Sequence, residues 1–271
     1  ACAADTDTDT DTDTVGGLSC STTQVAAFVD SAWVCRSIAL TTDGIIVGSI
    51  ESTLDWSDSV GQYLSMAIGT DNNPVISYHD NTNDDLKVYV CAATDCSSGT
   101  ARTLDETGNV GDDTSIAIGA DNNPIISYAD GTNTNLKVYV CAATDCSSGT
   151  ARTLDGIGWA TSIVIGADNN PIISYQDDSS EDLKVYVCAA TDCSSGTART
   201  LDETGNVGSR TTVVIGADDK PVISYYDTTN NNVKVYVCAA TDCSSGTART
   251  LVTNGGGPIS MLIGADDNPV I

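Results

Sequence analysis

The amino-acid sequence predicts an all-β fold, a five-bladed β-propeller with four-stranded blades. Three observations support this prediction. Equivalent tyrosines recur along the chain at intervals of 50, 47 and 50 residues, at Tyr78, Tyr128, Tyr175 and Tyr225. No stretch has a helical hydrophobic period. The thirteen residues CAATDCSSGTART occur four times, at 91–103, 141–153, 188–200 and 238–250.

Each repeat contains four short runs that are typical of β-strands. They are rich in β-branched and aromatic residues and are separated by Gly, Asn, Asp and Pro, which favour turns. In the second complete repeat these runs are 115–118, 124–128, 136–141 and 151–154. Four short strands in about 50 residues are typical of a propeller blade.

The repeats divide the chain into an N-terminal arm at 1–17 and a propeller at 18–271. The continuous blades are expected at 63–105, 114–154, 161–202 and 211–252. The two ends of the propeller, 259–271 and 24–54, supply two strands each to a closing fifth blade. Such closure removes open sheet edges. The alternative architecture is an open β-solenoid.

The arm alternates Asp and Thr, so that its aspartates lie on one side of an extended chain. Five like charges and no apolar surface favour disorder in isolation, yet an arm of this kind can add to a sheet edge. We expect it to dock on its own molecule or on a neighbouring subunit. The candidate assembly residues are Cys2, Asp5, Asp7, Asp9, Asp11 and Asp13.

Eleven cysteines indicate an oxidising compartment, outside the cell or at its surface. A zinc site is disfavoured because each Cys-x4-Cys pair lies in a separate repeat and His79 is the only histidine. Cys20 and Cys35 are expected to form a fifth pair, which leaves Cys2 as an odd cysteine. The favoured interpretation is that Cys2 forms a disulfide with a neighbouring subunit; the alternative is that it pairs with Cys20 or Cys35 and leaves another odd thiol. The four repeated pairs are Cys91/Cys96, Cys141/Cys146, Cys188/Cys193 and Cys238/Cys243.

The net charge of −26 excludes most polyanionic partners. Nucleic acids and anionic membranes are bound through basic surfaces, which this composition does not provide. No apolar run approaches the roughly 18–20 residues of a membrane span. Self-association and glycans remain as partners.

The loops between the second and third strands are rich in oxygen ligands. Each begins with an aspartate and continues with Asn, Asp, Ser or Thr, a composition that suits calcium. The favoured interpretation is that these residues make turns and cap backbone N–H groups. The candidate calcium ligands are Asp80, Asp130, Asp177 and Asp227.

No catalytic residues are predicted. His79 is replaced by Ala129, Gln176 and Tyr226 in the other repeats. Serines and aspartates are plentiful but equivalent between repeats, and glycosidase chemistry needs two carboxylates in distinct environments. The expectation is therefore that the protein is not an enzyme.

The pattern PxISYxD…LKVYVC…C resembles the repeats of secreted bacterial β-propeller proteins of uncharacterised function. By blade number and size the chain also resembles the five-bladed tachylectin-type lectins. The first resemblance implies a secreted propeller, and the second implies amino-sugar binding in each blade.

Together these features predict a non-enzymatic extracellular structural protein that assembles into filaments or a surface polymer through its arm. The first alternative is a lectin-like, carbohydrate-binding propeller. The second is the binding module of a surface lipoprotein anchored at Cys2, although Ala1 precedes that cysteine.

Overall fold

The computed structural model describes residues 24–29, 32–40, 46–48, 53–56, 59–255 and 259–271, with side chains from residue 53 onward. All regular structure in these residues is β-strand. No helix long and apolar enough to cross a membrane occurs in this part of the chain. The arm, Cys2, Cys20 and the side chain of Cys35 lie outside the described residues, so the docking and pairing expected of them stay predictions.

The chain forms two compact units, Ala1–Thr53 and Leu54–Ile271. The described part of the first unit is an antiparallel sheet with the order β1-β2-β3, in which Phe28 pairs with Trp33 across the first hairpin. Its strands are β1 (Gln24–Val29), β2 (Ala32–Leu40) and β3 (Ile46–Gly48).

The second unit contains four antiparallel sheets of four strands, which are four propeller blades. Blade 1 is β4 (Val60–Ile68), β5 (Pro74–Asp80), β6 (Asp85–Cys91) and β7 (Gly99–Asp105). Blade 2 is β8 (Val110–Ile118), β9 (Pro124–Asp130), β10 (Asn135–Cys141) and β11 (Gly149–Asp155). Blade 3 is β12 (Trp159–Ile165), β13 (Pro171–Asp177), β14 (Asp182–Cys188) and β15 (Gly196–Asp202). Blade 4 is β16 (Val207–Ile215), β17 (Pro221–Asp227), β18 (Asn232–Cys238) and β19 (Gly246–Val252).

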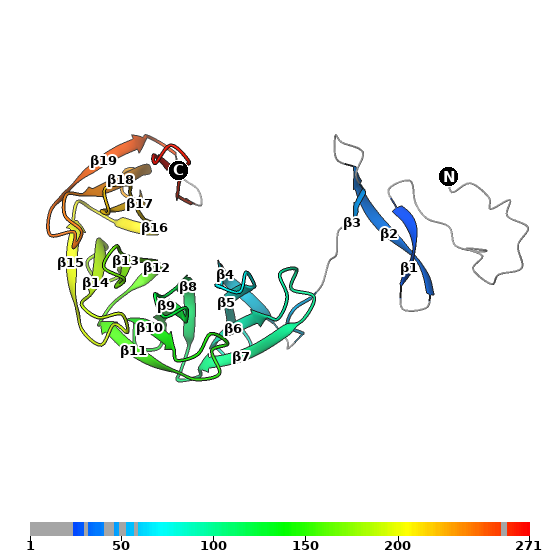
Figure 1. Ribbon diagram of the computed structural model, residues 1–271. Coiled ribbons are helices and arrows are strands. Elements are labelled where there is room, and N and C mark those ends of the chain that lie inside the picture. The colour runs from blue at the N-terminus through cyan, green and yellow to red at the C-terminus, as the bar shows by residue number, and fades with distance from the viewer. Residues whose placement is uncertain (1–23, 30–31, 41–45, 49–52, 57–58, 256–258) are drawn as a thin grey trace, which may run out of the picture. The chain divides into compact units, whose positions relative to one another are not determined.

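The first strand of each blade lies innermost and the fourth lies outermost (Figure 1). This arrangement confirms the predicted all-β propeller class. The expected strands are present, although β8 begins at Val110 rather than at 115. The extra residues at the start of each innermost strand line the centre of the unit.

Blades 2 and 3 are buried on both faces because each of them packs between two other blades. In β10, Leu136 and Val138 are fully buried on one face, and Lys137 and Tyr139 are at most 8% exposed on the other. Leu86 and Val88 of blade 1 pack against Tyr128 of blade 2, and the same cluster recurs at the next two junctions. Fully burying one such aliphatic side chain contributes about 2 kcal/mol.

A buried polar trio also joins each blade to the next, and we call it the clasp. In blade 2, Lys137 Nζ lies 2.5 Å from Asp105 Oδ2, and the Tyr128 hydroxyl donates to the same oxygen at 2.6 Å. Asp105 is the last residue of blade 1, so the clasp crosses the junction. Burial raises the pKa of Asp105, but hydrogen bonds from Lys137, Thr107 and Tyr128 lower it by more. The other clasps are Asp55–Tyr78–Lys87, Asp155–Tyr175–Lys184 and Asp202–Tyr225–Lys234.

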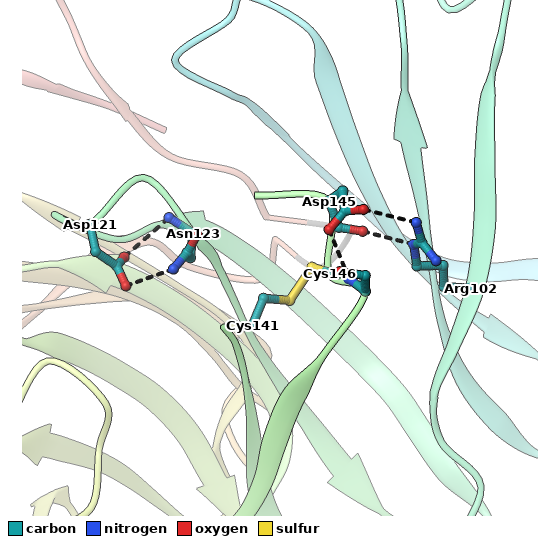
Figure 2. The surroundings of a disulfide bond; sticks show 7 residues. Arg102, Asp121, Asn123, Cys141, Asp145 and Cys146 are labelled. Atoms are coloured by element: carbon teal, nitrogen blue, oxygen red, sulfur yellow. Dashed lines mark hydrogen bonds and ion pairs between the residues drawn. A yellow bond between two sulfur atoms is a disulfide. The ribbon is translucent and has the colours of Figure 1, made fainter. Parts of the chain in front are cut away.

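The repeated cysteine loop forms a second connection between blades (Figure 2). The Cys141–Cys146 disulfide closes a loop that presents Asp145 to Arg102 of blade 1. The Arg102 guanidinium donates to the Asp145 carbonyl at 2.8 Å and to its carboxylate at 2.9 Å. The four predicted repeat disulfides are all present, with the remaining three at Cys91–Cys96, Cys188–Cys193 and Cys238–Cys243.

Serine side chains connect the innermost strands of neighbouring blades. Ser65 Oγ accepts from the backbone N–H of Ile116 at 3.2 Å, and Ser115 Oγ accepts from Ile163 N–H at the same distance. Ser162 and Val213 repeat the contact. These bonds fix the spacing of the strands around the central cavity described below.

Blade 1 has one exposed apolar face. Met66 is 61% exposed, whereas its counterparts Ile116, Ile163 and Val213 are 4–6% exposed. At the other end of the unit, β20 (Leu262–Ile263) and β21 (Pro269–Val270) form a small fifth sheet. The predicted closing blade, built from 259–271 and 24–54, stays a prediction.

Candidate functional site: a central cavity lined by unlike residues

The four innermost strands share one irregularity. Each loses its one-to-one register with the neighbouring strand at a β-bulge. At the bulge, Tyr63, Asp113, Ala160 and Arg210 adopt positive φ angles of 52°, 49°, 52° and 54°. Bulges of this kind change the direction of a side chain. These four residues occupy equivalent positions in the repeats, and all four line one cavity.

The cavity has a volume of about 480 Å³ and lies between the innermost strands. This volume is within the range of about 300–1,000 Å³ that is usual for small-molecule sites. The residues with distinctive chemistry in its wall are Tyr63, Asp113, Trp159, Gln176, Asp178 and Arg210. A tandem repeat therefore encloses a site that has no repeat symmetry.

Asp113 is the most buried carboxylate of the cavity wall. Its Oδ2 accepts from the Ala160 backbone N–H at 2.9 Å, and its carbonyl accepts from the Thr161 hydroxyl at 2.8 Å. Burial raises the pKa of Asp113, and the neighbouring charge of Asp112 raises it further, against the lowering effect of the Ala160 N–H. Asp178, in contrast, is exposed. The cavity thus holds two carboxylates in different environments.

A second ionisable group lies behind Asp113. His79 is 3% exposed, its Nδ1 lies 3.6 Å from Asp112 Oδ1, and neither ring nitrogen makes a hydrogen bond. Burial raises the pKa of Asp112, while His79 lowers it and Asp84 raises it. The Tyr63 ring lies 6.1 Å from the His79 ring. His79 therefore contacts a residue of the cavity wall without lining the cavity.

Blade 3 supplies an aromatic ring and an amide. Trp159 pairs with Gln176 in the register of β12 and β13. The Gln176 amide donates to Asn206 Oδ1 at 3.0 Å and to the Val207 carbonyl at 2.9 Å. The Trp159 indole N–H is buried and has no hydrogen-bond partner. Indole N–H groups usually find a partner when they are buried, so this donor is an exception in the wall of the cavity.

Blade 4 supplies a cation on an aromatic support. The Arg210 guanidinium lies 5.6 Å from the centre of the Tyr226 ring. Tyr226 is the counterpart of His79, Ala129 and Gln176, so four unlike residues occupy one position of the repeat. Stacking on an aromatic face restricts the orientation of a guanidinium and so prepares it for a planar partner.

The aspartates proposed as calcium ligands serve as turn residues. Asp130 Oδ1 accepts from the backbone N–H of Asn133 at 2.9 Å, and Asp80 makes the same contacts with Thr82 and Asn83. In the residues described, no group of three or more His, Cys, Asp or Glu side chains gathers to hold a metal ion. Calcium binding by Asp80, Asp130, Asp177 and Asp227 stays a prediction.

The sequence contains a signal for the cavity, which is variation between the repeats at particular positions. The positions of Tyr63 and His79 differ in every repeat, within a repeat that is otherwise nearly constant. In the sequence alone, variation at the His79 position indicates only that the repeat accepts different residues there. In the described blades, however, the residues at the Tyr63 position all line one cavity, where unlike residues form an asymmetric site.

Searches of known proteins show similarity in fold. No family model and no curated protein matches the chain. A protein of unknown function from Dyadobacter fermentans has a TM-score of 0.56 and 11% identity over 85% of this chain and 75% of that one. An exo-β-1,3-galactanase from Phanerochaete chrysosporium has a TM-score of 0.52 and 9% identity over 84% of this chain and 54% of that one. An α-L-arabinofuranosidase from Lactobacillus brevis has a TM-score of 0.51 and 12% identity over 76% of this chain and 80% of that one. This chain therefore spans about half the length of the galactanase.

These findings correct the expectation that the chain is not an enzyme. Glycoside hydrolases are among the structures with this fold, and the expectation had depended on the repeats being equivalent. The cavity wall is not equivalent between repeats, and two carboxylates in different environments, Asp113 and Asp178, line it. At 9–12% identity the likeness establishes the fold alone.

Proposed function

We propose that the protein is an exported carbohydrate-binding propeller whose central cavity receives a glycan. The observation that carries this proposal is the cavity of about 480 Å³, with Trp159 and Tyr63 among polar and charged side chains. Aromatic rings pack against the apolar faces of sugars, and carboxylate, amide and guanidinium groups form hydrogen bonds with sugar hydroxyls. A few convergent polar groups in an apolar wall are typical of ligand sites.

Export is supported by the four disulfides, which persist in oxidising environments. A single central site replaces the one shallow site per blade that the likeness to lectins implied, because the distinctive side chains gather at the centre. Assembly into filaments depends on residues 1–17, outside the described part of the chain, and stays a separate prediction.

Binding is tested by isothermal titration with β-1,3-galacto-oligosaccharides and arabino-oligosaccharides, the sugars suggested by the similar structures. Trp159→Ala is expected to abolish binding because it removes a ring from the cavity wall. Trp56→Ala is the matched control, since Trp56 is 81% exposed and lies outside the cavity. Equal loss in both variants, or undiminished binding by Trp159→Ala, contradicts the central site.

A second candidate function is glycoside hydrolysis, which the two unlike carboxylates favour. Asp113, whose raised pKa favours a protonated carboxyl, fits the general acid, and exposed Asp178 fits the second carboxylate. Release of reducing ends from the same oligosaccharides tests this function. Asp113→Asn and Asp178→Asn should each abolish it. Asp219→Asn, which introduces the residue found at Asn122 and Asn169, should leave it unchanged.

A further inference from the structure

Arg210 is unusual among the cations of this acidic chain. In the part of the chain whose side chains are described, every lysine and arginine except Arg210 and Arg249 forms an ion pair with an aspartate. The Arg210 side chain also makes no hydrogen bond with the described residues. Its guanidinium lies over the Tyr226 ring.

Arg249 and Arg210 are both exposed, and they differ in what lies around them. Arg102, Arg152 and Arg199 each bind an aspartate in the cysteine loop of the following blade. Arg249 is their counterpart on β19 of blade 4, which no complete blade follows among the described residues. Arg210 instead lies in the cavity wall, in the same cavity as Asp113 and Asp178, and pairs with neither.

We propose that Arg210 binds the carboxylate of an acidic sugar, so that the glycan received by the cavity contains a uronic acid. The planar guanidinium presents parallel N–H groups that match the two oxygens of a carboxylate. This inference rests on the proposed glycan-binding function and specifies its substrate class.

The overall charge of −26 does not prevent such binding. At ordinary salt concentrations the field of distant carboxylates is screened beyond about 10 Å, whereas a carboxylate in direct contact with the Arg210 guanidinium lies well inside that distance. Among the cavity carboxylates, Asp113 has a raised pKa because of its burial, which reduces its repulsion toward an anionic ligand. Asp178 is exposed, where solvent weakens its charge.

Isothermal titration with galacturonic acid and glucuronic acid, each compared with its methyl ester and with galactose or glucose, tests the proposal. The acids are expected to bind about 10-fold or more tightly than the esters, because hydrogen bonds between charged groups are worth that much. Arg210→Gln should reduce the affinity for the acids to that of the esters, and it should weaken binding of the acids by a larger factor than binding of the neutral sugars. Arg210→Lys should recover part of the preference, and Arg249→Gln should retain all of it.

Acids that bind no better than their esters, or a preference that survives Arg210→Gln, overturn the inference. If neutral sugars still bind and Trp159→Ala removes that binding, the proposed glycan binding stands without the inference about Arg210. If no sugar of any kind binds, the proposed function itself fails. Tighter binding of galactose 6-sulfate than of galacturonic acid overturns the assignment to a carboxylate.

Discussion

The ammonium group of Lys137 lies 2.5 Å from the carboxylate of Asp105, although 32 residues separate them and they belong to different blades. Tyr128 donates to the same carboxylate, so one buried oxygen connects three strands. The arrangement recurs at the next two junctions, with Asp155, Tyr175 and Lys184 and with Asp202, Tyr225 and Lys234.

Breaking one clasp should be costly. Lys137→Met leaves the Asp105 charge buried beside Tyr128, and removing one partner of a buried ion pair typically costs about 3–5 kcal/mol of unfolding free energy. Lys220→Met is the matched control because its pair with Asp218 is exposed, and it should cost less than about 1 kcal/mol. Urea denaturation measures the unfolding free energy of both variants. Equal losses of free energy would show that the clasp contributes no more than a surface ion pair.

Stability should fall steeply at acid pH. Burial raises the pKa of Asp202, but hydrogen bonds from Lys234, Thr204 and Tyr225 bring it down from 3.8 to about 2. A depressed folded-state pKa gives stability that is present above the unfolded-state value and is lost as pH falls through the folded-state value. Asp202 alone therefore contributes about 2 kcal/mol that disappears between about pH 4 and pH 2.

Thermal unfolding from pH 6 to pH 2 checks this expectation. The Asp105 and Asp155 clasps should add to the same transition, since their pKa values are also lowered. Asp202→Asn should be less stable at pH 6 and lose less stability between pH 4 and pH 2. A variant with the same acid slope as the unaltered protein would show that the clasp carboxylate is not ionised.

The innermost strand of blade 2 requires a glycine at its bulge. Gly111 has a φ of 98°, and an added Cβ would lie 2.8 Å from the Leu86 Cα of blade 1. Gly111→Ala should lower the unfolding free energy by about 2 kcal/mol, because both the backbone conformation and the close approach oppose a side chain. At Gly156 an added Cβ meets nothing within 4 Å, so Gly156→Ala should change stability by less than about 1 kcal/mol. Urea denaturation midpoints of the two variants check this difference, and equal midpoints would contradict it.

The closing blade can be tested through one exposed methionine. If a fifth blade covers blade 1 as the other blades are covered, Met66 is buried like Ile116, and Met66→Lys should cost about 3 kcal/mol or more. Thr70→Lys is the control, since Thr70 and its counterpart Ala120 are both exposed. A Met66→Lys protein as stable as the control would contradict a closed ring.

Asp113→Asn should separate stability from function. The raised pKa of Asp113 arises first from burial, so its charge opposes folding at neutral pH, and asparagine can still accept the Ala160 N–H. The unfolding free energy should therefore stay the same or rise, while glycan affinity falls about 10-fold or more. Calorimetry of the same sample measures both quantities. A large loss of stability would show that Asp113 is a structural residue.

The strands of the blades were predictable because each repeat carries the local pattern that forms them. Pro124 and its counterparts begin the second strand, an aspartate at the end of that strand opens the next turn, and Cys141 and Cys146 are close enough in sequence to pair. These are properties of single repeats, and four copies reinforce each of them.

The cavity was not predictable in the same way because it depends on which repeat positions meet at the centre. Asp113 and Arg210 are 97 positions apart in the sequence, and only the ring arrangement places both in one wall. The bulges that redirect their side chains follow no turn motif. For Asp105 and Lys137, opposite charges were visible in the sequence, but their pairing across a junction required the register of the blades.

In the proposed function, one asymmetric cavity at the centre of the propeller binds the glycan. Hydrogen–deuterium exchange of the protein with and without bound oligosaccharide tests this claim most directly. If the cavity binds the glycan, backbone amides at the bulges of β8, β12 and β16, around Asp113, Ala160 and Arg210, should become protected from exchange. Protection confined to the outer strands β7, β11, β15 and β19, with the bulges unchanged, would contradict it.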